Sequence, residues 1–100
     1  MELCNTVVIS GVVKKIYPIH YSPFGVCVHR FVLEHKSELM DNNVRRQVNL
    51  SLFCLILDVK ESQIRQTTEG SLVKLKGYLS QNMKAQIVMH VALVENLKKE

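Results

Sequence analysis

Histidine and cysteine are the residues in this chain that could bind a metal ion or act as nucleophiles. No two histidines have the H-x-x-x-H or H-E-x-x-H spacing that places two imidazoles on one face of a helix. The cysteines lie more than twenty residues apart and include no C-x-x-C pair, which argues against a zinc site or a disulfide framework. Because glycine-rich phosphate loops and G-x-S-x-G elbows are absent too, we expect a binding protein with no catalytic residues, no metal site and no cofactor. The side chains considered are His20, His29, His35, His90, Cys4, Cys27 and Cys54.

Basic side chains could instead bind phosphate groups. The chain carries 13 Lys and Arg residues against 9 Asp and Glu, a formal net charge of +4, which favours polyanionic partners. Single-stranded nucleic acid is bound by cations spaced along a groove and by flat side chains on which bases stack. The chain has no Trp, and we expect the stacking residues among Tyr17, Tyr21, Phe24 and Tyr78. Phe53 could serve either as a stacking surface or as a contact with a partner subunit.

The first half of the chain predicts strands that position these side chains. Residues 5–17 are rich in β-branched residues and are followed by Pro18, which is typical of a strand. Gly11 interrupts this strand and indicates a bend, which would let one long strand serve two sides of a small barrel. Residues 18–25 predict a loop with its turn at 22–25, residues 26–36 a second strand, and the polar residues 37–43 the next turn.

The clearest alternation in the chain predicts a third strand from Arg45 to Ile56. One face of this strand is expected to be core, and Cys54 falls on it, where a thiol is usually an inert small apolar group. The other face is polar and faces water, as in an antiparallel sheet with one wet side. The expected core residues are Val48, Leu50, Leu52, Cys54 and Ile56, and the outward residues are Arg45, Gln47, Asn49, Ser51 and Phe53.

Residues 58–68 break the alternation and predict a short helix or irregular crossover, with Asp58 as a candidate cap. A fourth strand follows, from Leu72, with Lys74, Lys76 and Tyr78 on its outer face. Residues 81–84 form a turn into a fifth strand over 85–97, which precedes the charged residues 98–100.

Three strands, a helical insert and two strands within 100 residues predict a single all-β domain over residues 1–100. A five-stranded OB-fold barrel fits this order, with the short helix or crossover between its third and fourth strands. An SH3-like barrel also has five strands, and composition does not exclude it. The ligand face of an OB fold is formed by its second and third strands and two flanking loops. Here those elements carry His20, Tyr21, Arg30, Lys36, Arg45, Asn49 and Lys84.

Further basic residues are expected beside this face. Arg45 and Arg46 in the third strand, Lys74 and Lys76 in the fourth, and the pair Lys14-Lys15 could extend one cationic wall along it. Such a wall would bind an unpaired strand through its phosphates. The N-terminus lacks a secretory signal and no apolar run is long enough to span a bilayer, so a cytoplasmic protein with no membrane contact is expected.

Several motifs in these strands resemble a known family. The segment Asn5-x-Val7-x-Ile9-Ser10-Gly11 is similar to the opening strand of bacterial single-stranded-DNA-binding proteins and their relatives. The segment Phe31-Val32-Leu33-Glu34-His35-Lys36-Ser37 resembles the second-strand motif of the primosomal replication protein N (PriB) family, and it is the most specific part of the match. The segments Arg46-Gln47-Val48, Glu69-Gly70-Ser71 and Gly77-Tyr78-Leu79-Ser80 extend the resemblance over nearly the whole chain.

This resemblance implies an OB-fold homodimer that binds single-stranded DNA without catalysis. It implies a role with the primosomal helicase PriA in DNA replication restart, followed by transfer to helicase-loading primosome proteins. Carried over by position, the DNA contacts fall on His20, Lys36, Arg45, Arg46, Asn49 and Lys84. Two departures lower the expected affinity for DNA. Asn49 stands where the family pattern can show a tryptophan, and the last loop is shorter than the lysine-rich form and keeps only Lys84.

Other functions are also compatible with the sequence. The chain could be an adaptor for the replication helicase with weak DNA binding, or a general single-stranded-DNA-binding protein. The general protein is disfavoured, because its relatives continue past the barrel to an acidic tip whereas this sequence stops at Glu100. An RNA-binding OB domain of the cold-shock or tRNA-binding type is disfavoured by the lack of closely spaced aromatic residues such as F-x-F on a strand. A homodimer would cover apolar strand faces that carry Val8, Val12, Val28 and Val32.

Overall fold

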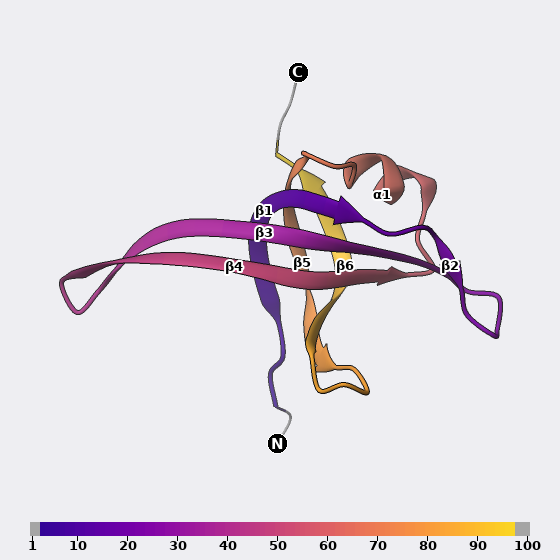
Figure 1. Cartoon of the computed structure of the whole chain (residues 1–100), viewed down its shortest axis with the longest axis horizontal. Helices are drawn as coiled ribbons and strands as arrows, with labels where there is room; N and C mark the ends of the chain where they lie inside the picture. The colour runs from indigo at the N-terminus through magenta and orange to yellow at the C-terminus, as the bar shows by residue number, and fades with distance from the viewer. Residues whose placement is uncertain (1–2, 98–100) are drawn as a thin grey trace.

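The computed structural model of the chain describes residues 3–97 and consists mainly of strands (Figure 1). The charged residues 98–100 and the first two residues lie outside this range. The elements in chain order are β1 (Val7–Ile16), β2 (His20–Tyr21), β3 (Cys27–Asp41), β4 (Val44–Leu57), α1 (Glu61–Gln66), β5 (Leu72–Gln81) and β6 (Ile87–Asn96).

Within residues 3–97, five of the six strands close into a barrel. The order around the barrel is β1-β5-β6-β4-β3, and β1 also pairs with β3, which closes the ring. Neighbouring strands are antiparallel except for β4 and β6, which are parallel. A five-stranded barrel with its helix between the third and fourth barrel strands is the predicted OB fold, and this prediction is confirmed.

Strand β1 serves two neighbours because it bends near its middle. It pairs with β5 from Val7 to Val12 and with β3 from Val12 to Ile16. Gly11 lies at the crossing, where a Cβ atom would overlap the carbonyl oxygen of Glu34 in β3. The bend predicted at Gly11 is therefore confirmed, because only a residue without a side chain lets the two strands approach this closely.

The inward faces of the strands fill the barrel with apolar side chains. Phe31 and Leu33 of β3 are fully buried. Cys54 of β4 is buried as predicted, and this burial raises the pKa of its thiol to about 12. The thiol is therefore protonated at neutral pH and packs as a small apolar group. The core prediction is wrong for Leu50, which is 38% exposed because its part of β4 extends beyond the barrel.

Strands β3 and β4 continue past the barrel as a two-stranded arm, at the left of Figure 1. Their pairing runs from Val28 with Leu57 to Asp41 with Val44. The turn between them is only Asn42 and Asn43, whose positive φ angles of 50° and 65° suit a two-residue hairpin. The predicted turn over 37–43 is therefore wrong, because most of its polar residues are paired across the arm.

The crossover contains the predicted short helix, but its start differs from the prediction. Asp58 has a φ of 53° and does not cap α1. The helix begins after Lys60, whose backbone N–H donates to Oε1 of Gln63 at 2.9 Å. At the other end, buried Thr67 donates from Oγ1 to the Gln63 carbonyl oxygen (2.8 Å) and contacts Nε2 of buried His29 (2.9 Å), which ties the crossover to β3.

The segment 18–25 contains one feature that the sequence did not predict. His20 and Tyr21 form β2, which pairs with Val28 and Cys27 of β3. The turn at 22–25 is confirmed, since the N–H of Gly25 donates to the Ser22 carbonyl oxygen at 2.9 Å. Across residues 3–97, none of the helical structure is long and apolar enough to cross a membrane.

Candidate nucleic-acid interface

A groove opens on the outer face of β3 and β4, beside the turn that joins β5 to β6. Strand β3 contributes Arg30 to this groove, β4 contributes Phe53, and the chain just after β1 contributes Tyr17. The turn contributes Asn82 and Gln86. Successive side chains of a strand point to opposite faces, so Arg30 and Phe53 point outward while their neighbours fill the core. We call these five residues the aromatic groove.

The aromatic groove brings two rings together with the cation of Arg30, and Lys15 lies over the Tyr17 ring. The ring centroids of Tyr17 and Phe53 lie 6.5 Å apart, with planes tilted by 30°. Nζ of Lys15 lies 4.9 Å from the centroid of the Tyr17 ring, and Cζ of Arg30 lies 5.6 Å from the same centroid. Both distances are within the range of a cation–π interaction. Phe53 is 42% exposed, so the groove has an apolar surface in the same lining as the guanidinium group of Arg30.

The turn beside the groove is held in shape by Asn82. Its Oδ1 accepts hydrogen bonds from the backbone N–H groups of Lys84 (2.9 Å) and Gln86 (3.0 Å). Its Nδ2 donates to Oε1 of Gln86 at 2.9 Å, which fixes the Gln86 amide. Ala85 adopts a positive φ of 60° within this turn. The exposed Lys84, one of the predicted contacts, is therefore carried on an ordered turn next to the groove.

The outward face of the arm continues from the groove and carries three of the predicted contacts. Lys36 and Asn49 are paired across β3 and β4, and Arg45 is paired with Met40 nearer the tip. All three side chains are exposed, and their positions along β3 and β4 place them on the same face of the sheet as Phe53. The structure therefore places Lys36, Asn49 and Arg45 on one face with the groove, which we call the outer wall.

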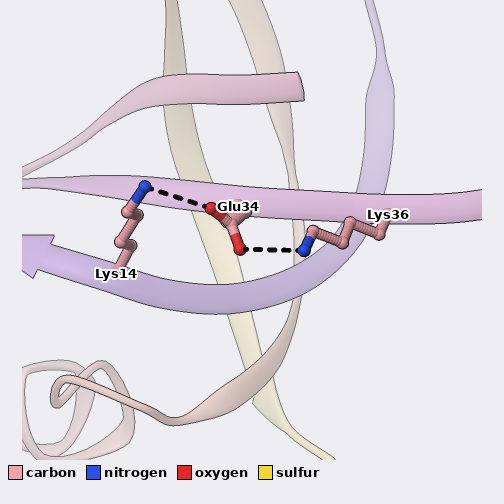
Figure 2. A network of polar contacts seen from close by, with 3 residues as sticks. All are labelled: Lys14, Glu34 and Lys36. Carbon is pink, nitrogen blue, oxygen red and sulfur yellow. Dashed lines mark ion pairs between the residues drawn. The ribbon is translucent and has the colours of Figure 1, made fainter. Parts of the chain in front are cut away.

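Acidic neighbours partly neutralise this wall. Glu34 of β3 lies between Lys14 and Lys36, with N···O distances of 3.2 Å and 3.8 Å (Figure 2). Arg45 pairs with Glu38 at 3.1 Å. Exposed ion pairs of this kind are weak, about 0–1 kcal/mol each. They lower the positive potential of the arm without fixing its side chains.

Arg46 does not share the outer wall. It follows Arg45 directly in β4, so its side chain points to the opposite face of the arm. There it lies 3.9 Å from Asp41. Arg45 and Arg46 therefore cannot contact the same segment of nucleic acid on one face of the arm.

Lys74 and Lys76 lie on a different wall of the barrel. They are exposed on β5, where they pair in register with Ser10 and Val8 of β1 on one side and with Glu95 and Leu93 of β6 on the other. In the barrel order, β1 and β6 separate β5 from β3 and β4. The expectation of a single continuous cationic wall is therefore wrong for these two lysines.

His20 and Tyr21 lie at the end of the barrel away from the arm. Both side chains are exposed on β2, which adds to the edge of β3. A hydrogen bond with the Cys27 thiol raises the pKa of Tyr21 above its usual value of 10.0. Tyr21 is thus an uncharged aromatic side chain at neutral pH.

The sequence did not identify the groove as a unit. The sequence indicates Tyr17 and Phe53 as possible stacking residues and predicts Arg30 on the ligand face, but it does not predict that the three lie together. Their proximity depends on the pairing of β1 with β3, which places Lys15 opposite Val32, and of β3 with β4, which places Val32 opposite Phe53. No local pattern encodes that register. Gln86 gave no signal of its own.

The closed barrel and its strand order define an OB-fold protein. Residues 5–93 match the model of a family described as another single-strand binding protein family. The chain belongs to this family.

The proteins that resemble this chain in sequence include replication restart proteins PriB from several bacteria. The chain is 28% identical over 98 residues to the replication restart protein PriB of Neisseria meningitidis serogroup C, covering 98% of this chain and 96% of that protein. It is 29% identical over 101 residues to the replication restart protein PriB of Haemophilus ducreyi, covering 96% of this chain and 82% of that protein. The resemblance to the PriB family is therefore confirmed.

Solved structures show the same fold. PriB from Ralstonia solanacearum superposes with a TM-score of 0.85 at 22% identity, covering 96% of this chain and all (100%) of that one. A deletion mutant of the single-stranded DNA binding protein from Thermus aquaticus superposes with a TM-score of 0.74 at 18% identity, covering 95% of this chain and 51% of that one. These likenesses settle the choice between the two five-stranded barrels in favour of the OB fold.

Proposed function

We propose that this chain is a single-stranded-DNA-binding accessory protein of the primosome, which stimulates the PriA helicase in DNA replication restart. It acts in the cytoplasm by binding rather than by catalysis, and hands on to helicase-loading primosome proteins. The aromatic groove carries this proposal, because it joins a stacking surface to cations on the ligand face of an OB fold. The PriB relatives support the role in replication restart.

The DNA contacts that we propose follow the outer wall. Lys84 on the turn and Arg30 in the groove contact phosphates, and Lys36, Arg45 and Asn49 extend the path along the arm. His20 and Tyr21 extend it at the β2 end. Arg46, Lys74 and Lys76 point away from this path and contribute at most to the overall field of the protein.

Titration of fluorescent single-stranded and duplex DNA of equal length at two salt concentrations tests the proposal. If each protomer neutralises roughly three phosphates, log K falls with log salt with a slope of about −2, using about 0.7 per phosphate. We expect the single strand to bind more tightly than the duplex, because bases in a duplex are not free to stack. A flat salt response, or equal affinity for both forms, would reject binding at this wall.

A homodimer is part of the proposal, and the wall of β1, β5 and β6 supports it. Val8 of β1 and Leu93 of β6 lie on either side of Lys76 and are 54% and 62% exposed. Val12 is exposed as well, but Val28 is buried and Val32 is half-buried, so the expectation that the four valines lie on uncovered faces is wrong for these two. Sedimentation at low protein concentration checks the assembly, and a stable monomer would contradict it.

An adaptor for the helicase with weak DNA contact is the second candidate. The ion pairs of Lys36, Arg45 and Arg46 favour it, because each of these cations already has an acidic neighbour within 4.0 Å. Measuring the affinity for an oligonucleotide and for PriA separately distinguishes the two functions. Tight DNA binding by the isolated chain would exclude the adaptor.

A further inference from the structure

The apolar surface of Phe53 lies in a place where burial by protein is unfavourable. Its ring is 42% exposed on β4, within a groove that also holds the guanidinium group of Arg30. A protein partner that covered this ring would also have to desolvate the nearby cations, which is costly unless each is paired. The apolar faces suited to a protein contact, with Val8 and Leu93, lie on a different wall.

Tyr17 has a different role from Phe53, although the two rings are neighbours. The Tyr17 ring is only partly exposed and contacts both Lys15 and Arg30 through its π surface. Neither cation has a carboxylate within ion-pair distance among residues 3–97. Tyr17 therefore holds two unneutralised charges over its own ring, which neighbours Phe53, while the Phe53 ring remains available for another flat group.

A nucleobase with its flanking phosphates matches this arrangement. Its flat face is apolar and stacks on an aromatic ring, and the phosphates on either side are acceptors for the two cations. Gln86 also lines the groove, and its Oε1 accepts a hydrogen bond from Asn82, so its Nε2 is left as a donor of the kind that a base edge accepts.

We propose that Phe53 is the stacking surface for one unpaired nucleobase, and that Tyr17 positions Lys15 and Arg30 on the adjacent phosphates. This inference rests on the proposed function, because it names where on the outer wall a base is held. It goes further in making part of the affinity depend on the base itself rather than on charge alone.

The test compares an oligothymidine of about twelve nucleotides with a strand of the same length from which every base is missing. For the wild-type protein we expect the abasic strand to bind about 5- to 150-fold more weakly, the range for loss of one stacked base. Phe53→Leu should weaken oligothymidine binding by a similar factor and leave abasic binding unchanged. Phe53→Tyr, which keeps a ring, should restore most of the difference.

Tyr78→Leu is the matched control. Tyr78 is also 42% exposed, but it stacks on His90 of β6 at 4.7 Å and does not line the groove. This variant should bind both strands within about twofold of the wild-type protein, less than the loss of one stacked base. An equal loss with Tyr78→Leu and Phe53→Leu would overturn the assignment to Phe53. Thermal melting of both variants establishes that they are folded.

The outcomes separate this inference from the proposed function. If the wild-type protein binds neither strand, the proposed function fails. If it binds both strands equally, electrostatic binding stands and the stacking role of Phe53 is overturned.

Discussion

Glu34 is the residue whose replacement should most clearly increase DNA binding. Its carboxylate lies between Lys14 and Lys36 on the outer wall, and its side chain is 33% exposed (Figure 2). The three side chains together carry a net charge of +1. Glu34→Gln keeps the shape of the side chain but raises this charge to +2 and releases both lysines. We therefore expect tighter binding to single-stranded DNA rather than weaker binding.

The magnitude follows from counterion release. One additional phosphate contact steepens the slope of log K against log salt by about 0.7. If that contact contributes nothing at about 1 M salt, it tightens binding about fourfold at about 0.15 M. The cost in stability is small, because two exposed ion pairs of 3.2 Å and 3.8 Å are lost, and such pairs contribute about 0–1 kcal/mol each.

The assay is a fluorescence-anisotropy titration of an oligonucleotide over a range of salt concentrations. Glu61→Gln is the matched control, because it makes the same charge change and removes a 2.9 Å ion pair with Arg65 on α1, away from the outer wall. We expect Glu34→Gln to tighten binding and steepen the salt slope, with a smaller effect of Glu61→Gln. Equal effects of the two variants would show that only net charge matters and would refute the local reasoning.

Three other predictions follow from single contacts. Lys84→Ala should weaken binding evenly across sequences and reduce the salt slope by about 0.7, and a change in sequence preference in the same titrations would contradict a purely phosphate contact. Burial lowers the pKa of His29 below its usual 6.5. As the pH falls, the unfolded chain therefore binds a proton on this imidazole before the folded chain does. The contribution of His29 to the free energy of unfolding is thus fully present above pH 6.5 and is lost as the pH falls below 6.5. Urea unfolding should give a lower free energy of unfolding at about pH 5.5 than at about pH 7.5, and the difference between the two pH values should be smaller for His29→Gln. Gly77→Ala should lower the free energy of unfolding by about 1–3 kcal/mol, because the new Cβ would overlap the carbonyl oxygen of His90; an unchanged melting temperature would count against the close approach of β5 and β6.

The fold could be predicted from the sequence because its signals are local. Alternation of side chains placed Cys54 in the core and Phe53 outside it, and the β-branched run that ends before Pro18 marked the first strand. The bend at Gly11 was predictable too, since a glycine inside a strand marks a close approach.

The arm and the site could not be predicted in the same way. The polar residues at 37–43 have the composition of a turn, but they form strands because they are paired across β3 and β4. The alternation along β5 correctly predicts that Lys74 and Lys76 point outward, as Arg45 does in β4. It does not predict which wall of the closed barrel β5 occupies. The groove depends on two strand registers at once, so neighbours such as Tyr17 and Phe53 are distant in sequence and adjacent only in space.

The central claim is that an unpaired strand lies along the outer wall of β3 and β4, across the aromatic groove. Mapping the backbone amide signals of the isotope-labelled protein by NMR during titration with single-stranded DNA tests this most directly. We predict shifts at Tyr17, Arg30, Phe53 and the turn carrying Lys84, with little change around Lys74 and Lys76. Shifts centred on the β1–β5–β6 wall, with the groove unaffected, would contradict the account.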